Sequence, residues 1–246
     1  MLRFFINLFA LVFVIAINYL SNALPFNGQT TAEISNRLNV LFTPAGYVFS
    51  IWGVIYLLLA IWVFRQLPKG RRDLPVYIKG TPLFILSCFL NSVWLFLWHY
   101  EYFNLSVIIM LAFLINLIVL YTRVKAVATS FSDLLPFSVY LGWVSVATIA
   151  NVSYVLVENG WNGFELSDSF WTIAMLIIAT LLAVLFRLKE KDIAYPLVFV
   201  WAFIGIGIRN SSEYSLVAYT AFFFAAVVFL IALFGRQKHL PTRLRK

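Results

Sequence analysis

The segment IIMLAFLINLIVL, residues 108–120, indicates most directly what kind of fold this chain adopts. It carries no charge, and it does not alternate apolar with polar residues as a strand of a membrane barrel would. It forms the centre of one of eight apolar stretches, each about long enough to cross a bilayer as a helix. The stretches cover residues 4–24, 45–66, 81–99, 104–122, 134–157, 169–187, 193–209 and 214–234.

The overall composition agrees with this interpretation. Of 246 residues, 63% are hydrophobic and only 11% are charged, which leaves too little polar surface to cover a water-soluble core. Backbone groups in hydrocarbon must find their hydrogen bonds within the segment, and a helix achieves this. We therefore predict an all-α integral membrane protein with about eight transmembrane helices.

The basic residues predict an orientation. If the eight stretches cross the membrane in alternation, all but two of the 18 Lys and Arg residues fall on one side, the exceptions being Arg37 and Arg209. Basic loops mark the cytoplasmic side, so we expect both termini in the cytoplasm and a bacterial inner (cell) membrane as the location. Anionic lipid accounts for the net charge of +8, and we expect no nucleic-acid partner.

The first stretch has a second interpretation. Its basic start and the small residues that end it at 21–23 also suit a secretory signal peptide. Its apolar run is longer than a usual signal core, so we expect residues 1–23 to be retained as a helix.

The connection at 25–44 is the longest between two stretches. Thr30 and Glu33 have the spacing of a capping box, which predicts a short helix near 31–39. A connection of this length in a compact bundle is often a lid over a functional site.

Few residues suit ordinary catalysis or metal binding. Cys88 is the only cysteine, and His99 and His239 are the only histidines. No charged residue lies well inside a predicted span, which disfavours an ion-coupled transporter. We predict no catalytic residues, no metal site and no obligatory cofactor.

Three spans carry aromatic and amide residues at helical spacing, so each set lies on one face of its helix. The sets are Pro44, Val48, Trp52 and Tyr56; Ser87, Asn91, Trp94 and Trp98; and Pro136, Tyr140, Trp143, Ala147, Asn151 and Tyr154. If the three faces meet, they enclose an aromatic cavity beneath the 25–44 connection that suits a flat, largely apolar ligand. The alternative is that these residues only pack helices together.

Residues near the end of the third span have their own alternatives. Trp98, His99, Tyr100 and Tyr102 are typical of an interfacial aromatic belt. A less favoured interpretation makes His99 an axial ligand of a metalloporphyrin.

The same three segments resemble the signature segments of the TspO/MBR family, the tryptophan-rich sensory and translocator proteins. PAGYVFSIWGVIY at 44–56 is similar to the start of the family's second helix, and Leu90, Asn91 and Trp94 match L-N-x-x-W of its third. Tyr140, Trp143, Ala147 and Asn151 match the spacing of its fifth helix. The chain departs from the family pattern at Thr43, Tyr47, Val139 and Val146, where proline, tryptophan, proline and phenylalanine are usual.

The resemblance implies a five-helix bundle that binds porphyrins, or in animals cholesterol and drugs, in a pocket closed by the first loop. It implies pocket roles for Pro44, Trp52, Asn91, Trp143 and Ala147. Trp52 and Trp143 are similar to two tryptophans linked to light-dependent porphyrin breakdown. With the facing residues Trp94, Tyr140 and Asn151, these form the predicted ligand site.

The resemblance covers about residues 4–157. We therefore divide the chain into a TspO-like five-helix bundle at 1–157, with its lid at 25–44, and three further helices with a basic tail at 158–246. Tyr195, Trp201, Gly205 and Gly207 in the second part either extend the bundle by close packing, which the glycines favour, or form a homodimer surface.

The function expected from these features is that of a membrane receptor or sensor, not an enzyme, with a small lipophilic ligand such as a porphyrin or haem. The alternatives are a facilitator of lipophilic solute transport, a light-dependent porphyrin-degrading protein, and a scaffold without a ligand.

Overall fold

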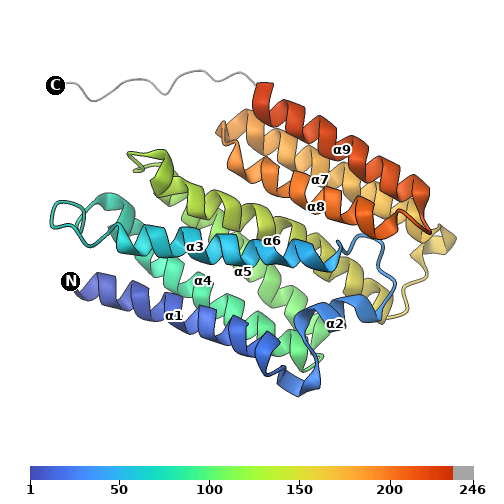
Figure 1. The fold of residues 1–246 in the computed structure, drawn as a ribbon, viewed down its shortest axis with the longest axis horizontal. Helices are drawn as coiled ribbons and strands as arrows, with labels where there is room; N and C mark the ends of the chain where they lie inside the picture. The colour runs from blue at the N-terminus through green and yellow to red at the C-terminus, as the bar shows by residue number, and fades with distance from the viewer. Residues whose placement is uncertain (235–246) are drawn as a thin grey trace.

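The computed structural model describes residues 1–234, and within them every regular element is helical (Figure 1). The long helices are α1 (Leu2–Ala23), α3 (Ile51–Phe64), α4 (Pro75–His99), α5 (Phe103–Lys125), α6 (Phe131–Glu158), α7 (Asp168–Glu190), α8 (Ala194–Asn210) and α9 (Ser215–Phe234). The short elements are η1 (Phe26–Gly28), α2 (Thr31–Arg37), η2 (Gly46–Ser50) and η3 (Gly163–Glu165).

Seven of these helical segments are long and apolar enough to cross a bilayer, counting η2 and α3 together. The eighth, α8, has 17 residues, or about 25 Å, which is less than the roughly 30 Å of a hydrocarbon core. It is packed among α6, α7 and α9, and the buried polar residues Asp192 and Asn210 mark its two ends. The prediction of an all-helical membrane protein is confirmed. Seven described helices are long enough to cross a bilayer, and α8 has the same length of 17 residues as the predicted stretch at 193–209.

The capping box at the start of α2 is present. The Thr30 side chain accepts a hydrogen bond from the Glu33 backbone N–H, and the Glu33 carboxylate accepts one from the Thr30 N–H at 2.7 Å. The predicted short helix is thus confirmed as Thr31–Arg37.

The predicted start of the third span at residue 81 is wrong by six residues, because α4 begins at Pro75. Proline suits the first position of a helix, where its missing N–H would have no intrahelical partner.

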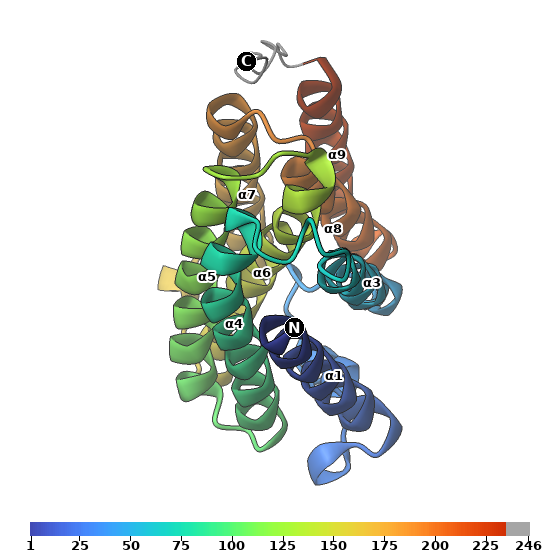
Figure 2. The same ribbon diagram turned by 90° about the vertical axis from the view of Figure 1, so that its left-hand side faces the viewer.

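The helices form two connected groups. Helices α1, α3, α4, α5 and α6 make one bundle, and α7, α8 and α9 make a second layer beside it (Figures 1 and 2). Helix α8 joins the groups, because it packs against both α6 and η2.

Close packing at the glycines of α8 is confirmed. A Cβ atom on Gly205 would lie 2.2 Å from Val48 Cγ2, and one on Gly207 would lie 2.6 Å from the Phe222 ring of α9. The helices can approach this closely only because these positions lack a side chain. A homodimer surface stays a prediction.

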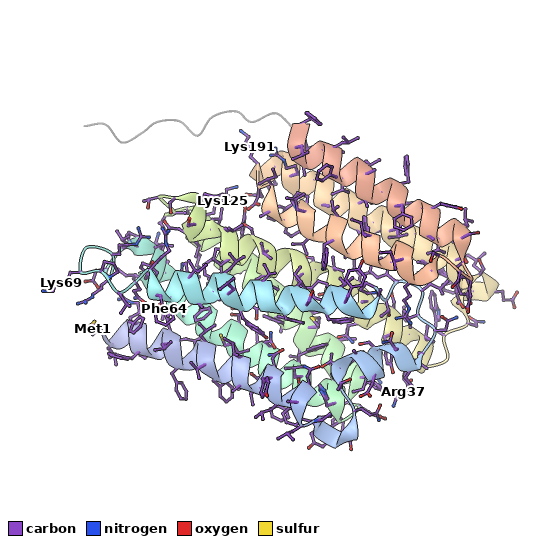
Figure 3. All side chains as sticks on the ribbon, in the orientation of Figure 1. Met1, Arg37, Phe64, Lys69, Lys125 and Lys191 are labelled. Carbon is purple, nitrogen blue, oxygen red and sulfur yellow. The ribbon has the colours of Figure 1, made fainter. Side chains whose placement is uncertain are left out.

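The basic residues gather at one end of the bundle. Met1, Lys69, Lys125 and Lys191 lie at this end, and Arg37 lies at the other (Figure 3). We call it the basic end; it comprises the N-terminus and the loops at 65–74, 126–130 and 191–193. Which side of the membrane it faces stays a prediction, and the predicted basic tail after residue 234 is outside the described residues.

The belt interpretation is wrong for two of its four residues. Trp98 and His99 are buried in the bundle, whereas Tyr100 and Tyr102 are more than half exposed. Trp98 stacks on Trp94, with ring centroids 5.6 Å apart, and packs against Tyr154. The last turn of α4 therefore faces other helices rather than lipid headgroups.

Candidate functional site

The three signature segments meet at their aromatic residues. The Trp52 indole of α3 lies edge-on to two rings of α6, with centroids 5.9 Å from Tyr140 and 6.3 Å from Trp143. Asn91 of α4 donates a hydrogen bond to the Tyr140 hydroxyl at 3.1 Å. Helical periodicity put these residues on one face of each helix, and the fold brings those faces together.

A cavity of about 340 Å³ adjoins this meeting point, and we call it the main cavity. Helices α1, α2, α3 and α4 enclose it. Its lining consists of Ile15, Asn18, Tyr19, Asn22, Thr31, Ala32, Phe49, Trp52, Gly53, Tyr56, Trp94 and Leu95. Tyr19, Asn22 and Gly53 are exposed, so the cavity opens between α1 and α3. The Trp52 and Tyr56 rings form a stacked wall, with centroids 5.7 Å apart.

A second space of about 50 Å³, the small cavity, lies between α4, α6 and the segment before α3. Its lining consists of Ser35, Thr43, Pro44, Phe49, Trp94, Trp98, Trp143, Val146, Ala147, Ala150, Asn151 and Tyr154. Phe49 and Trp94 line both cavities, so they form the partition between them.

Two indole groups on the small cavity have unused hydrogen-bond donors. The Nε1 atoms of Trp98 and Trp143 are buried and have no partner within the described residues. Leaving a buried donor unpaired costs about 1–3 kcal/mol. Both side chains line the small cavity, and neither N–H group is used to hold the described helices together.

The eight predicted site residues divide into three sets by position. Trp52 and Trp94 line the main cavity, and Pro44, Trp94, Trp143, Ala147 and Asn151 line the small one. Asn91 and Tyr140 line neither and are fully buried beneath them. A role in ligand binding stays a prediction for all eight.

The amide groups chiefly connect helices. Asn91 accepts a hydrogen bond from Asn18 of α1 at 3.1 Å, in addition to the one it donates to Tyr140. Asn151 accepts from Trp94 Nε1 at 3.1 Å and donates to Ser106 of α5 at 3.1 Å. For these two asparagines, the packing interpretation describes the observed contacts.

Several lining residues were not predicted. Helix α1 contributes Asn18 and Asn22, and the last turn before α3 contributes Phe49. Asn18 and Asn22 are four residues apart in a span whose other polar residues include Asn7 and Ser21, so their spacing was a usable signal for one polar face. Phe49 lies within the signature segment at 44–56, but helical spacing did not single it out, because phenylalanine occurs throughout the chain.

His99 lines neither the main cavity nor the small one. Its Nδ1 lies 2.7 Å from the Leu95 carbonyl oxygen, and its Nε2 lies 3.4 Å from the Thr31 hydroxyl. Both ring nitrogens thus contact protein groups, and His99 joins α4 to α2. This geometry disfavours its interpretation as an axial ligand.

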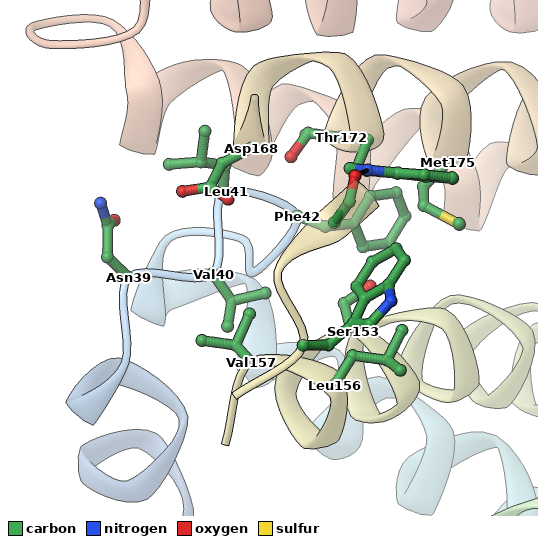
Figure 4. A pocket seen from close by; sticks show the side chains of 13 residues that line it. Asn39, Val40, Leu41, Phe42, Ser153, Leu156, Val157, Asp168, Thr172 and Met175 are labelled. Atoms are coloured by element: carbon green, nitrogen blue, oxygen red, sulfur yellow. Dashed lines mark hydrogen bonds between the residues drawn. The ribbon is translucent and has the colours of Figure 1, made fainter. Parts of the chain in front are cut away.

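A third cavity, of about 70 Å³, lies farther along the lid connection (Figure 4). Asn39, Val40, Leu41 and Phe42 line it together with residues of α6 and α7. The predicted site residues are absent from its lining. It shows that the connection after α2 passes between the two groups of helices.

Comparison with known proteins relates this chain to a described family. A family model described as TSPO-like protein matches residues 4–234. The chain matches no curated protein and no solved structure. The family match includes α7, α8 and α9, which lie beyond the residues that the signature segments cover.

The match supports a sensing or ligand-binding role in a membrane, without naming a ligand. Because the match extends over nearly the whole chain, this protein belongs to the TSPO-like protein family.

Proposed function

We propose that this protein is a membrane receptor or sensor that holds a flat, largely apolar molecule of the tetrapyrrole class in the main cavity. The aromatic lining carries the proposal: Phe49, Trp52, Tyr56 and Trp94 surround a space of about 340 Å³. Binding pockets for small molecules typically measure about 300–1,000 Å³ and combine apolar walls with a few polar groups. The main cavity fits the lower part of that range.

The polar groups are placed at the margins of the aromatic walls. Asn18 and Asn22 supply amides from α1, and Trp98 and Trp143 supply indole N–H groups in the small cavity. The indole and phenol faces would contact the ring of the ligand, and the amides would bind its polar edge.

Phe49 would control how much space a ligand has. A ligand wider than the main cavity would require the Phe49 ring to turn aside, which would join the two cavities. Trp143 and Ala147 would then contact the ligand as well.

The packing at the basic end favours a receptor over a facilitator. The fully buried Trp62 fills the space between α3, α4 and α6, with its ring centroid 5.0 Å from Tyr77, 5.4 Å from Phe84 and 5.1 Å from Phe137. A facilitator needs access to its cavity from both sides. Uptake of protoporphyrin into proteoliposomes faster than into empty vesicles would favour the facilitator instead.

The test of this proposal is a substitution at Gly53 that places a larger side chain in the wall of the main cavity. A Cβ atom on Gly53 would have no neighbouring atom within 4 Å, so the side chain of Gly53→Phe starts in open space and adds a ring to the cavity wall. We expect the affinity for protoporphyrin, measured by quenching of tryptophan fluorescence in lipid nanodiscs, to fall about tenfold or more, equivalent to about 1.4 kcal/mol.

Gly46→Phe is the matched control. Gly46 belongs to the same span, has equally open surroundings and lies outside the cavity linings. Equal affinities in both variants and the wild type would refute binding in the main cavity. A thermal-shift panel of protoporphyrin, haem, a sterol and a carotenoid would then identify the ligand class, because a ligand stabilises the state that binds it.

A further inference from the structure

Helix α8 and the turn after it hold the connection that follows α2. Asn210 Nδ2 donates a hydrogen bond to the Leu41 carbonyl oxygen at 2.9 Å. Two residues earlier in the connection, Asn39 Nδ2 donates to the Tyr214 hydroxyl at 2.9 Å. Both bonds join residues more than 160 positions apart, so they tie the second helix group to the lid connection.

The same helix also holds η2, where the second span begins. The Ala45 N–H donates to the Gly205 carbonyl oxygen at 3.1 Å. Trp201 Nε1 donates to the Val48 carbonyl oxygen at 3.1 Å, and its ring lies edge-on to Tyr47 at 5.3 Å. Residues 41–48 are thus hydrogen-bonded to three positions along α8, at Trp201, Gly205 and Asn210.

Gly205 provides the space into which this segment fits. Val48 is fully buried, and a Cβ atom on Gly205 would lie 2.2 Å from its Cγ2 and 3.2 Å from Pro44 Cβ. Val48 is β-branched, so its side chain has few other rotamers to adopt. Any side chain at position 205 would therefore push η2 away from α8.

The residue after Val48 is Phe49, which separates the two cavities, and Trp52 follows one turn later. We propose that Trp201, Gly205 and Asn210 of α8 are positioning residues for the ligand cavity. They fix the position of residues 41–48, so that Phe49 and Trp52 line the main cavity. The inference rests on the proposed function for the ligand, and it gives the second helix group a role in the site.

The test uses the full-length protein in nanodiscs without ligand and measures hydrogen–deuterium exchange of residues 36–50. In Gly205→Ala we expect exchange in this segment to rise about tenfold, because the local opening that exposes it becomes easier. Gly207→Ala adds the same methyl group two residues away, against Phe222 of α9, and should leave residues 36–50 at the wild-type rate.

A compensating substitution separates positioning from general damage to the fold. Val48→Ala in the Gly205→Ala background removes Val48 Cγ2, the atom that the new methyl group would approach most closely, and should restore slow exchange in residues 36–50. Equal exchange in Gly205→Ala and Gly207→Ala, or no restoration in the double variant, would overturn the inference.

Protoporphyrin binding is then measured for the same variants. If the wild type does not bind, the proposed function fails, while the exchange data still decide whether α8 positions the segment. If the wild type binds, we expect weaker binding in Gly205→Ala and recovery in the double variant. Unchanged affinity in Gly205→Ala would show that the segment does not form the ligand's wall.

Discussion

Asn91 accepts a hydrogen bond from Asn18 of α1 and donates one to the Tyr140 hydroxyl of α6, each at 3.1 Å. One side chain thus links three helices directly below the main cavity. Interhelical hydrogen bonds in membranes contribute roughly 0.6 kcal/mol on average and at most about 1.7 kcal/mol each. Their larger effect is to orient the rings, because the Tyr140 hydroxyl can reach Asn91 only while Tyr140 faces α4.

Replacing Asn91 by leucine should therefore have a larger effect on the stability of the bundle than on the affinity for a ligand. Asn91→Leu removes both bonds, so we expect the free energy of unfolding to fall by about 1–2 kcal/mol. Reversible unfolding in mixed detergent micelles measures it. Asn116→Leu is the control, because Asn116 donates one bond, to the Leu83 carbonyl oxygen, and its loss should cost less. Unchanged stability with a large loss of affinity would instead place Asn91 in contact with the ligand.

At the level of elements, α2 is the part of the lid that reaches the main cavity, through Thr31 and Ala32. A helix of seven residues is too short to be stable by itself. It depends on its capping box, on the fully buried Ile34, and on the ion pair at 2.6 Å between Arg37 and Glu101 after α4. Helix α2 is thus stabilised at both ends by polar contacts and in the middle by packing.

The capping box makes this element sensitive to acid. The hydrogen bond from the Thr30 backbone N–H, followed by that from its hydroxyl, lowers the pKa of Glu33 from its ordinary value of 4.5. A lowered folded-state pKa means that Glu33 stabilises α2 above pH 4.5 and that this stabilisation is lost as the pH falls through the folded-state pKa. We expect amide exchange in residues 31–37, corrected for intrinsic rates, to accelerate as the pH falls below the ordinary value of 4.5 and through the lowered pKa of Glu33.

Glu33→Gln tests the cause of that acceleration. Glutamine also accepts the capping-box hydrogen bond but does not titrate. In this variant, amide exchange in residues 31–37, corrected for intrinsic rates, should be the same in acid as at neutral pH. If it accelerates in acid as much as the wild type, another group causes the effect.

Over the whole molecule, the charged pairs lie at the two ends of the bundle. Asp133 pairs with Arg65 at 3.1 Å and with Arg71 at 2.8 Å at the basic end, while the pair of Arg37 lies at the opposite end. Between these ends the described helices bury aromatic and amide side chains. This distribution is what a bilayer requires, because a charge in the hydrocarbon is costly whereas a paired charge near the headgroups is not.

The orientation of the whole molecule can be measured with single cysteines. Cys88 is 2% exposed and should not react, so Lys69→Cys and Glu213→Cys report the basic end and the opposite end separately. In intact bacterial cells, we expect a membrane-impermeant maleimide to label Glu213→Cys and to label Lys69→Cys only after permeabilisation. The reverse pattern would place the basic end outside and contradict the predicted orientation.

The sequence alone determined the features that depend on side-chain chemistry and on local spacing. Its apolar stretches predicted the helices, its basic residues predicted two chemically different ends, and Thr30 with Glu33 predicted α2. Spacings of three and four residues also predicted that Trp52, Asn91 and Trp143 face the interior. The physical reason is that the bilayer selects residues by polarity, and a helix repeats its faces over a few residues.

Only the tertiary structure decided which helices share which contacts. It added Asn18 and Asn22 of α1 to the main cavity, placed Asn91 beneath the cavities rather than in their linings, and joined α8 to the segment before Phe49. In a soluble helix, polar residues mark the outward face, so a sequence indicates which side is buried. In lipid both faces are apolar, and the choice of partner then depends on packing between residues far apart in the chain, where one missing Cβ at Gly205 determines how closely two helices approach.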